Sequence, residues 1–142
     1  MKPIQMVDLK GQYDKIKEDV NAGIQECLDT TAFINGPAVK EFQKNFEHYL
    51  GVKHVIPCAN GTDALQIAMM ALDLQPDDEV LCPAFTYVAT AEVIGLLGLK
   101  PVMTDVMPDT FCIETNDLEK YLTPKTKAIV PVHLYGQSAD ME

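Results

Sequence analysis

The chain after its first third alternates short strand-forming runs with helix-forming runs, and this alternation constrains the fold more than any other feature. The runs that predict strands are His54–Pro57, Glu79–Cys82, Lys100–Asp105 and Lys127–His133, with helices predicted between them over Thr62–Leu72, Tyr87–Leu97 and Asn116–Leu122. The strand runs do not alternate apolar with polar residues, so we expect strands buried on both faces. Repeats of strand and helix form right-handed βαβ units, which predicts an α/β fold with a mostly parallel sheet and flanking helices.

The first third of the chain has a different rhythm. Apolar residues recur at steps of three and four over roughly Gly11–Asp29, which predicts an amphipathic helix. Thr30–Asn35 breaks this period and is predicted as a loop. A second helix is predicted to open at Gly36-Pro37, because proline suits the first helical turn. We therefore expect an N-terminal helical segment over residues 1–52 and an α/β domain over residues 53–142.

Composition and charge exclude several classes of function. A net charge of −10 argues against nonspecific binding to nucleic acid and against docking on anionic membranes. It leaves room for a small phosphorylated ligand, because a local cup of amides can hold an anion on an acidic protein. No apolar run predicts a signal peptide or a membrane span, so a cytoplasmic protein is expected. The four cysteines and three histidines are scattered, which predicts reduced thiols and no metal site.

The segment Asn60-Gly61-Thr62-Asp63 lies where a predicted strand turns into a predicted helix. Such a turn collects several backbone N–H groups at the positive end of the helix dipole, which suits a phosphate. Gly61 allows close approach of the backbone, and Thr62 adds a hydroxyl group. Neither the Walker pattern nor the three-glycine dinucleotide pattern is present, so a phosphate cup of another kind is predicted. A capped helix after a tight turn, with no ligand, is the alternative that the segment leaves open.

Polar and aromatic residues also follow the other predicted strands. Open α/β sheets bind ligands at the carboxyl ends of their strands, so these residues are expected to gather at one edge. They are Pro83–Tyr87 after the second strand, Asp105 after the third, and His133, Tyr135 and Gly136 after the fourth. An aromatic ring in Phe85-Thr86-Tyr87 could stack on a planar cofactor. A place for this ring in the hydrophobic core is the alternative.

Six blocks of sequence, taken in order, resemble the beginning of a known family. They are Met6–Leu9, Phe33–Pro37, Asn60–Leu65, Pro83–Glu92, Pro101-Val102 with Asp105, and Val132–Gly136. Together they resemble the DegT/DnrJ/EryC1/StrS family of pyridoxal-phosphate-dependent nucleotide-sugar aminotransferases, and the resemblance runs over essentially the whole chain. It implies part of the large domain of a type I aminotransferase, preceded by two N-terminal helices.

The resemblance also implies roles for particular residues. Gly61, Thr62 and Asp63 resemble the segment that binds the cofactor phosphate, and Tyr87 resembles the aromatic residue that stacks on the pyridine ring. Phe33, Ile34, Asn35 and Gly36 resemble the loop that contacts the sugar nucleotide and the partner subunit of a homodimer.

The implied reaction moves an amino group, usually from glutamate, through pyridoxal phosphate to a nucleotide-linked keto-sugar. This chemistry serves the biosynthesis of cell-surface polysaccharides or related sugars. Some relatives are dehydratases, and this chain does not distinguish them.

In the family, the lysine that forms the Schiff base lies downstream of the region present here, so no catalytic residue is assigned. We therefore expect the N-terminal part of a longer enzyme that is inactive alone. With a strand neighbour missing, His54–Pro57 is expected to favour strand swapping or dimerisation. The alternatives are a phosphate-binding module without chemistry and a fragment that only oligomerises.

Overall fold

The computed structural model describes residue 4 and residues 6–142, and it divides the chain after Pro57. The first unit is Met1–Pro57 and the second is Cys58–Glu142, and each is described by itself. Residues 1–3 and 5 of the predicted helical segment lie outside the described residues. Within the described part, no helix is both long enough and apolar enough to cross a bilayer.

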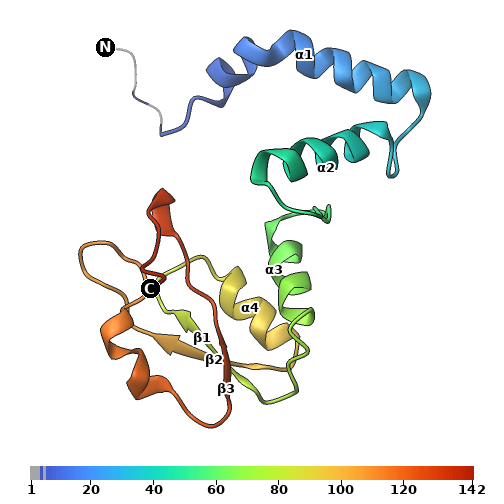
Figure 1. Ribbon diagram of the computed structural model, residues 1–142. Helices are drawn as coiled ribbons and strands as arrows, with labels where there is room; N and C mark the ends of the chain where they lie inside the picture. The colour runs from blue at the N-terminus through green and yellow to red at the C-terminus, as the bar shows by residue number, and fades with distance from the viewer. Residues whose placement is uncertain (1–3, 5) are drawn as a thin grey trace. The chain divides into compact units, whose positions relative to one another are not determined.

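The first unit contains two helices, α1 (Leu9–Thr30) and α2 (Pro37–Leu50), which confirms both helices predicted from the sequence (Figure 1). Helix α1 begins at Asp8, whose carboxylate accepts a hydrogen bond from the Gly11 N–H at 2.9 Å. Helix α2 has a proline in its first turn and ends at Gly51, whose φ of 67° suits glycine.

The apolar faces of α1 and α2 remain exposed, because neither helix contains a buried residue. Phe42, Phe46 and Tyr49 stack along α2, with ring centroids 5.4 and 6.3 Å apart. Other exposed apolar side chains on the two helices are Leu9, Ile16, Ile24, Leu28 and Leu50. The amphipathic pattern therefore predicted the helices correctly, but within the described residues their apolar faces are not buried.

The strand predicted at His54–Pro57 is wrong, since this segment has no strand partner among the described residues. Side chains of α2 supply the backbone hydrogen bonds that a neighbouring strand would have made. The Val55 N–H donates to Glu47 Oε1 at 3.0 Å, and the Val55 carbonyl accepts from Gln43 Nε2 at 2.8 Å. Buried or half-buried backbone groups need hydrogen-bond partners, and here two side chains supply them.

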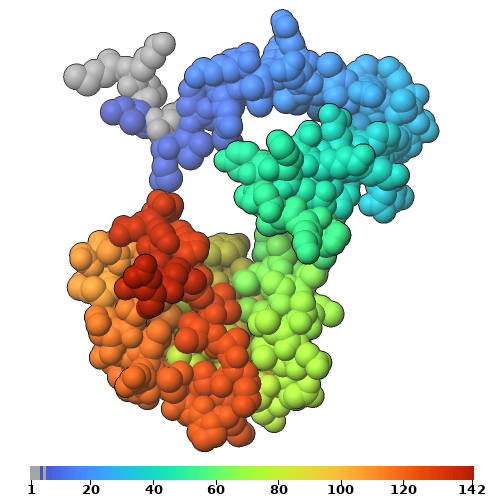
Figure 2. Space-filling view, in the orientation of Figure 1, coloured from blue at the N-terminus to red at the C-terminus, as the bar shows by residue number. Residues whose placement is uncertain are grey.

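The second unit contains a parallel sheet of three strands in the order β2-β1-β3 (Figure 1). Its elements are α3 (Gly61–Met70), β1 (Glu79–Pro83), α4 (Ala89–Leu96), β2 (Lys100–Thr104), the 3₁₀ helix η1 (Thr115–Tyr121), β3 (Thr126–Ile129) and the 3₁₀ turn η2 (Leu134–Gly136). This arrangement confirms the predicted parallel sheet with flanking helices. In the space-filling view these residues, coloured green to red, form a closely packed body (Figure 2).

Two predicted elements of this unit differ in detail. The last strand ends at Ile129, not at His133, although the Val130 N–H still bonds to the Leu81 carbonyl at 2.8 Å. The helix predicted over Asn116–Leu122 is a 3₁₀ helix. It is capped by Glu114, whose side chain accepts from the Asn116 N–H at 3.0 Å.

The hydrophobic core of the second unit forms around β1, all of whose residues are buried. Strands β2 and β3 are only partly buried, so the prediction of strands buried on both faces holds for β1 alone. The reason is that β1 has a strand on each side, whereas β2 and β3 are the edges of the sheet; α4 packs on both β1 and β2. The core cluster consists of Met69, Val80, Cys82, Val93, Ile94 and Leu99.

Glu79 joins all three strands at the amino end of the sheet. Its buried carboxylate accepts from Nζ of Lys100, the first residue of β2, at 2.8 Å and from the hydroxyl of Thr123, which precedes β3, at 2.6 Å. Its N–H donates to the Lys125 carbonyl at 2.9 Å. The hydrogen bonds from Lys100 and then from Thr123 hold the pKa of Glu79 below its usual value, despite the opposing effect of desolvation.

The substitution Ile94→Ala should lower the free energy of unfolding of this unit by about 2–5 kcal/mol, because Ile94 is fully buried against β1. Leu96→Ala on the same helix is the matched control, because Leu96 is 68% exposed. The control should change stability by no more than about 0.5 kcal/mol. Urea unfolding followed by circular dichroism measures both, and equal effects of the two variants would contradict this core.

Glu79 should make stability depend on pH. Because its folded pKa is lowered, its stabilisation is complete above the unfolded value of about 4.3 and is lost as pH falls through the folded pKa. The variant Glu79→Gln cannot ionise, so its free energy of unfolding should fall less steeply than that of the wild type between about pH 5 and about pH 3. Urea titrations at several pH values measure the two slopes. Identical slopes would show that the carboxylate is not held in this way.

Candidate functional site

Helix α3 begins at Asn60, and the local hydrogen bonds explain why. The Asn60 side chain accepts from the Asp63 N–H at 2.9 Å, and its amide group donates to Asp63 Oδ2 at 3.2 Å. The Ala64 N–H bonds to the Asn60 carbonyl at 3.0 Å. The Asn60 side chain therefore caps the first turn, and the Asp63 carboxylate holds the Asn60 amide group in place.

The first N–H groups of α3 remain available to a ligand. Within the described residues, the N–H groups of Gly61 and Thr62 and the Thr62 hydroxyl have no hydrogen-bond partner. The first turn of a helix leaves such groups unsatisfied, and the helix dipole makes their surroundings attractive to an anion. Gly61 is exposed, and a Cβ placed on it would meet no atom within 4 Å. These donors and the open space above them fit a phosphate group. The Asp63 N–H is already used in the cap.

Tyr87 lies exposed at the same edge of the sheet, just before α4. Its side chain is 77% exposed, so it is not part of the core. It lines an open hollow of about 370 Å³, together with Ala84, Phe85, Thr86, Leu134 and Tyr135. Phe85 also packs on Phe111, with ring centroids 5.4 Å apart. The hollow has an aromatic wall of the kind that can hold a planar ring.

The topology of the second unit explains this gathering. Helix α3 leads down to the start of β1, and α4 returns from the end of β1, so both helices begin toward the carboxyl edge of the sheet (Figure 1). Turn η2 follows β3, which runs parallel to β1, and therefore lies at the same edge. Gly61, Thr62, Asp63 and Tyr87 thus lie in one unit at one edge. Gly61, Thr62 and Asp63 do not line the hollow beside Tyr87.

Two other residues at this edge have structural partners. His133 Nδ1 accepts from the Ala139 N–H at 3.0 Å, which ties the start of η2 to the buried Ala139. The Asp105 side chain accepts from the Val106 N–H at 2.9 Å, and its carbonyl accepts from the Glu114 N–H at 3.1 Å. Both residues shape loops around the edge.

The loop Phe33–Gly36 lies in the first unit, between α1 and α2. Phe33 and Ile34 are 66% and 87% exposed, and Asn35 has a φ of 49°. Gly36 is required by space, because a Cβ on it would lie 2.5 Å from the Ala32 carbonyl oxygen. The loop therefore presents two apolar side chains on a constrained backbone. Because it belongs to the other unit, the structure does not place it relative to Tyr87 or Gly61.

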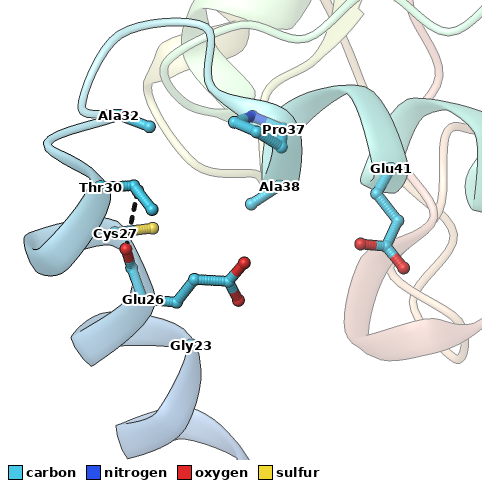
Figure 3. A pocket seen from close by; sticks show the side chains of 8 residues that line it. All are labelled: Gly23, Glu26, Cys27, Thr30, Ala32, Pro37, Ala38 and Glu41. Carbon is cyan, nitrogen blue, oxygen red and sulfur yellow. Dashed lines mark hydrogen bonds between the residues drawn. The ribbon is translucent and has the colours of Figure 1, made fainter.

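A second hollow, of about 250 Å³, lies beside this loop between α1 and α2 (Figure 3). The carboxylates of Glu26 and Glu41 and the thiol of Cys27 face it. Thr30 donates its hydroxyl hydrogen to the Glu26 carbonyl at 2.7 Å. Among the described residues, no group of three or more His, Cys, Asp or Glu side chains is arranged to hold a metal ion.

The resemblance implies no individual role for Asn60, Phe85 or Tyr135, although the structure places Asn60 at the start of α3 and the other two at the hollow. Asn60 has a readable signal, because asparagine before a helix is a favoured cap. Phe85 lies in the segment Phe85-Thr86-Tyr87, for which the sequence predicts a stacking ring without distinguishing Phe85 from Tyr87. The sequence predicts Tyr135 at the carboxyl edge of the sheet, but its position beside Tyr87 depends on the pairing of β3 with β1.

Removal of the cap should weaken the start of α3. We expect Asn60→Ala to lower the free energy of unfolding by about 1 kcal/mol, because the Asp63 N–H loses its acceptor. Asn60→Ser should retain most of the stability, since serine also caps helices. Denaturant unfolding of both variants measures the difference. If both variants lost equal stability, the side-chain cap would not be the cause.

Comparisons with known proteins identify the family of this chain. The model of the DegT/DnrJ/EryC1/StrS aminotransferase family matches residues 14–142. The UDP-2-acetamido-2-deoxy-3-oxo-D-glucuronate aminotransferase of Pseudomonas aeruginosa is 51% identical over 139 residues, which are 98% of this chain and 39% of that protein.

Two solved structures are also similar. DesV of S. venezuelae aligns with a TM-score of 0.93 at 34% identity, over 99% of this chain and 38% of that one. The ntda protein of Bacillus subtilis, with bound cofactor PMP, aligns with a TM-score of 0.85 at 41% identity, over 89% of this chain and 29% of that one. The chain thus spans less than two fifths of the length of these solved relatives. On these matches, the chain belongs to the DegT/DnrJ/EryC1/StrS aminotransferase family.

Proposed function

We propose that this chain is the cofactor-phosphate-binding part of a pyridoxal-phosphate-dependent aminotransferase. The enzyme would move an amino group, with glutamate as donor, to a keto-sugar linked to a nucleotide. The observation that carries the proposal is the start of α3, where the Gly61 and Thr62 N–H groups and the Thr62 hydroxyl have no hydrogen-bond partner among the described residues, and where a Cβ on Gly61 would meet no atom within 4 Å. The 51% identity to a UDP-sugar aminotransferase supports the same substrate class.

Each residue of the edge has a proposed task. The N–H groups of Gly61 and Thr62 donate to the cofactor phosphate, at the positive end of the α3 dipole. Asp63 and Asn60 keep this turn in shape through their reciprocal hydrogen bonds. The Tyr87 ring, which is exposed and lines the hollow, would stack against the ring of the cofactor. When bound, pyridoxal phosphate supplies the electron sink for amino transfer.

The lysine that carries the cofactor is proposed to lie outside these 142 residues, so this chain contributes binding and orientation only. The loop Phe33–Gly36 is proposed to contact the sugar nucleotide through its exposed apolar side chains. A homodimer is proposed to complete the site, and the exposed apolar faces of α1 and α2 offer surface for such an assembly. A cytoplasmic location suits sugar-nucleotide chemistry.

Binding of pyridoxamine 5′-phosphate, measured by isothermal titration calorimetry, tests the phosphate cup. Thr62→Val removes the hydroxyl without changing the size of the side chain, and we expect affinity to fall about tenfold or more. Gly61→Ala adds a methyl group where the protein leaves space, so it should fold normally and bind more weakly.

Gly95→Ala is the matched control, because a Cβ there also meets no atom within 4 Å, but on helix α4. It should retain the affinity of the wild type. Borohydride treatment with pyridoxal phosphate should add no stoichiometric cofactor mass to the chain. Affinity that is unchanged in both Thr62→Val and Gly61→Ala would overturn the proposal that the start of α3 binds the phosphate. Stoichiometric reduction of the cofactor onto a lysine would overturn the proposal that the cofactor lysine lies outside these 142 residues.

A further inference from the structure

Tyr135 has a strained backbone that its own packing does not explain. Its φ of 54° and ψ of 25° are left-handed, a conformation that costs a residue with a bulky side chain free energy. The side chain is 84% exposed, so burial of the ring offsets none of this cost within the described residues. Strain of this kind persists where surrounding structure enforces it, and it concentrates at functional sites.

The surrounding structure that enforces this conformation is visible. Turn η2 is closed by hydrogen bonds from the Gly136 N–H to the His133 carbonyl at 3.4 Å and from the Gln137 N–H to the Leu134 carbonyl at 3.1 Å. His133 is held in turn by the Ala139 N–H. These bonds fix where the Tyr135 side chain leaves the backbone.

Tyr135 lines the same hollow as Tyr87. Tyr135 and Leu134 come from the segment after β3, whereas Ala84–Tyr87 come from the segment after β1. Both strands are parallel neighbours, and the Val130 N–H continues their pairing through the Leu81 carbonyl. Figure 1 shows η2, in red-orange, at the edge where the chain leaves β1 for α4. Two exposed tyrosines thus line one hollow.

We propose that Tyr135 is a second aromatic contact, beside Tyr87, for a planar heteroaromatic ring of a phosphorylated ligand that occupies this hollow. This inference rests on the proposed function and adds a specificity residue to it. Aromatic rings bind such rings through offset stacking or edge-to-face contact. The ring has two possible sources, the pyridine of the cofactor and the base of the nucleotide in the sugar substrate.

Calorimetric titration of the full chain with two probes, pyridoxamine 5′-phosphate and uridine diphosphate, tests the inference. Tyr135→Asn removes the ring, and asparagine tolerates the left-handed conformation well. We expect affinity for at least one probe to fall about threefold to tenfold. The urea midpoint should stay the same or rise, because the strain is relieved without loss of a buried side chain. The probe whose affinity falls identifies the source of the ring.

Two further variants complete the test. Tyr135→Phe keeps the ring and should retain affinity, and a loss equal to that of Tyr135→Asn would overturn the aromatic contact. Tyr121→Asn is the control for a tyrosine of the same unit, since Tyr121 is partly exposed and does not line the hollow, and it should leave affinity unchanged.

The remaining outcomes separate this inference from the proposed function. If Tyr135→Asn left both affinities unchanged while Gly61→Ala weakened binding, only the role of Tyr135 would be overturned. If the wild type bound neither probe, the proposed function and this inference would both be overturned. A lower urea midpoint with unchanged affinity would show that Tyr135 supports the fold and does not contact the ring.

Discussion

The parallel pairing of β1 with a strand on each side is the constraint on which the second unit depends. It buries β1 completely and gives α4 a surface to pack on. Glu79 secures the amino end of this arrangement through Lys100 and Thr123, which flank it on opposite sides. Because the strands are parallel, the segments that leave them emerge together at the opposite edge. The aromatic hollow therefore exists as a consequence of strand direction.

The start of α3 shows how one structure combines stability with a capacity for binding. Asn60 and Asp63 bond to each other, and Asn60 satisfies one N–H of the first turn, so the start of the helix is capped without a ligand. In the part of the chain that the structure describes, two further N–H groups, those of Gly61 and Thr62, have no partner because the cap does not reach them. A phosphate placed there would complete the hydrogen bonding of the turn without rearranging it, which is the preorganisation that tight anion binding requires.

Much of the fold could be predicted from local pattern. The two N-terminal helices follow from periodicity, and Gly36-Pro37 marks the start of the second. Where prediction failed, a distant partner decided the outcome. His54–Pro57 has strand-like composition, but Gln43 and Glu47 satisfy the backbone of Val55 in place of a strand. Strands β2 and β3 are as apolar as expected, yet they lie at the edges of the sheet and stay partly exposed.

The sequence by itself determined the helices, the central strand, the capped glycine turn before α3 and the family to which the chain belongs, because these depend on neighbouring residues or on motifs in order. Only the tertiary structure decided which residues meet. Tyr87 and Tyr135 are distant in the chain and share one hollow because β1 and β3 pair in parallel. The left-handed backbone of Tyr135 is likewise a product of contacts around η2, since no local preference of tyrosine favours it.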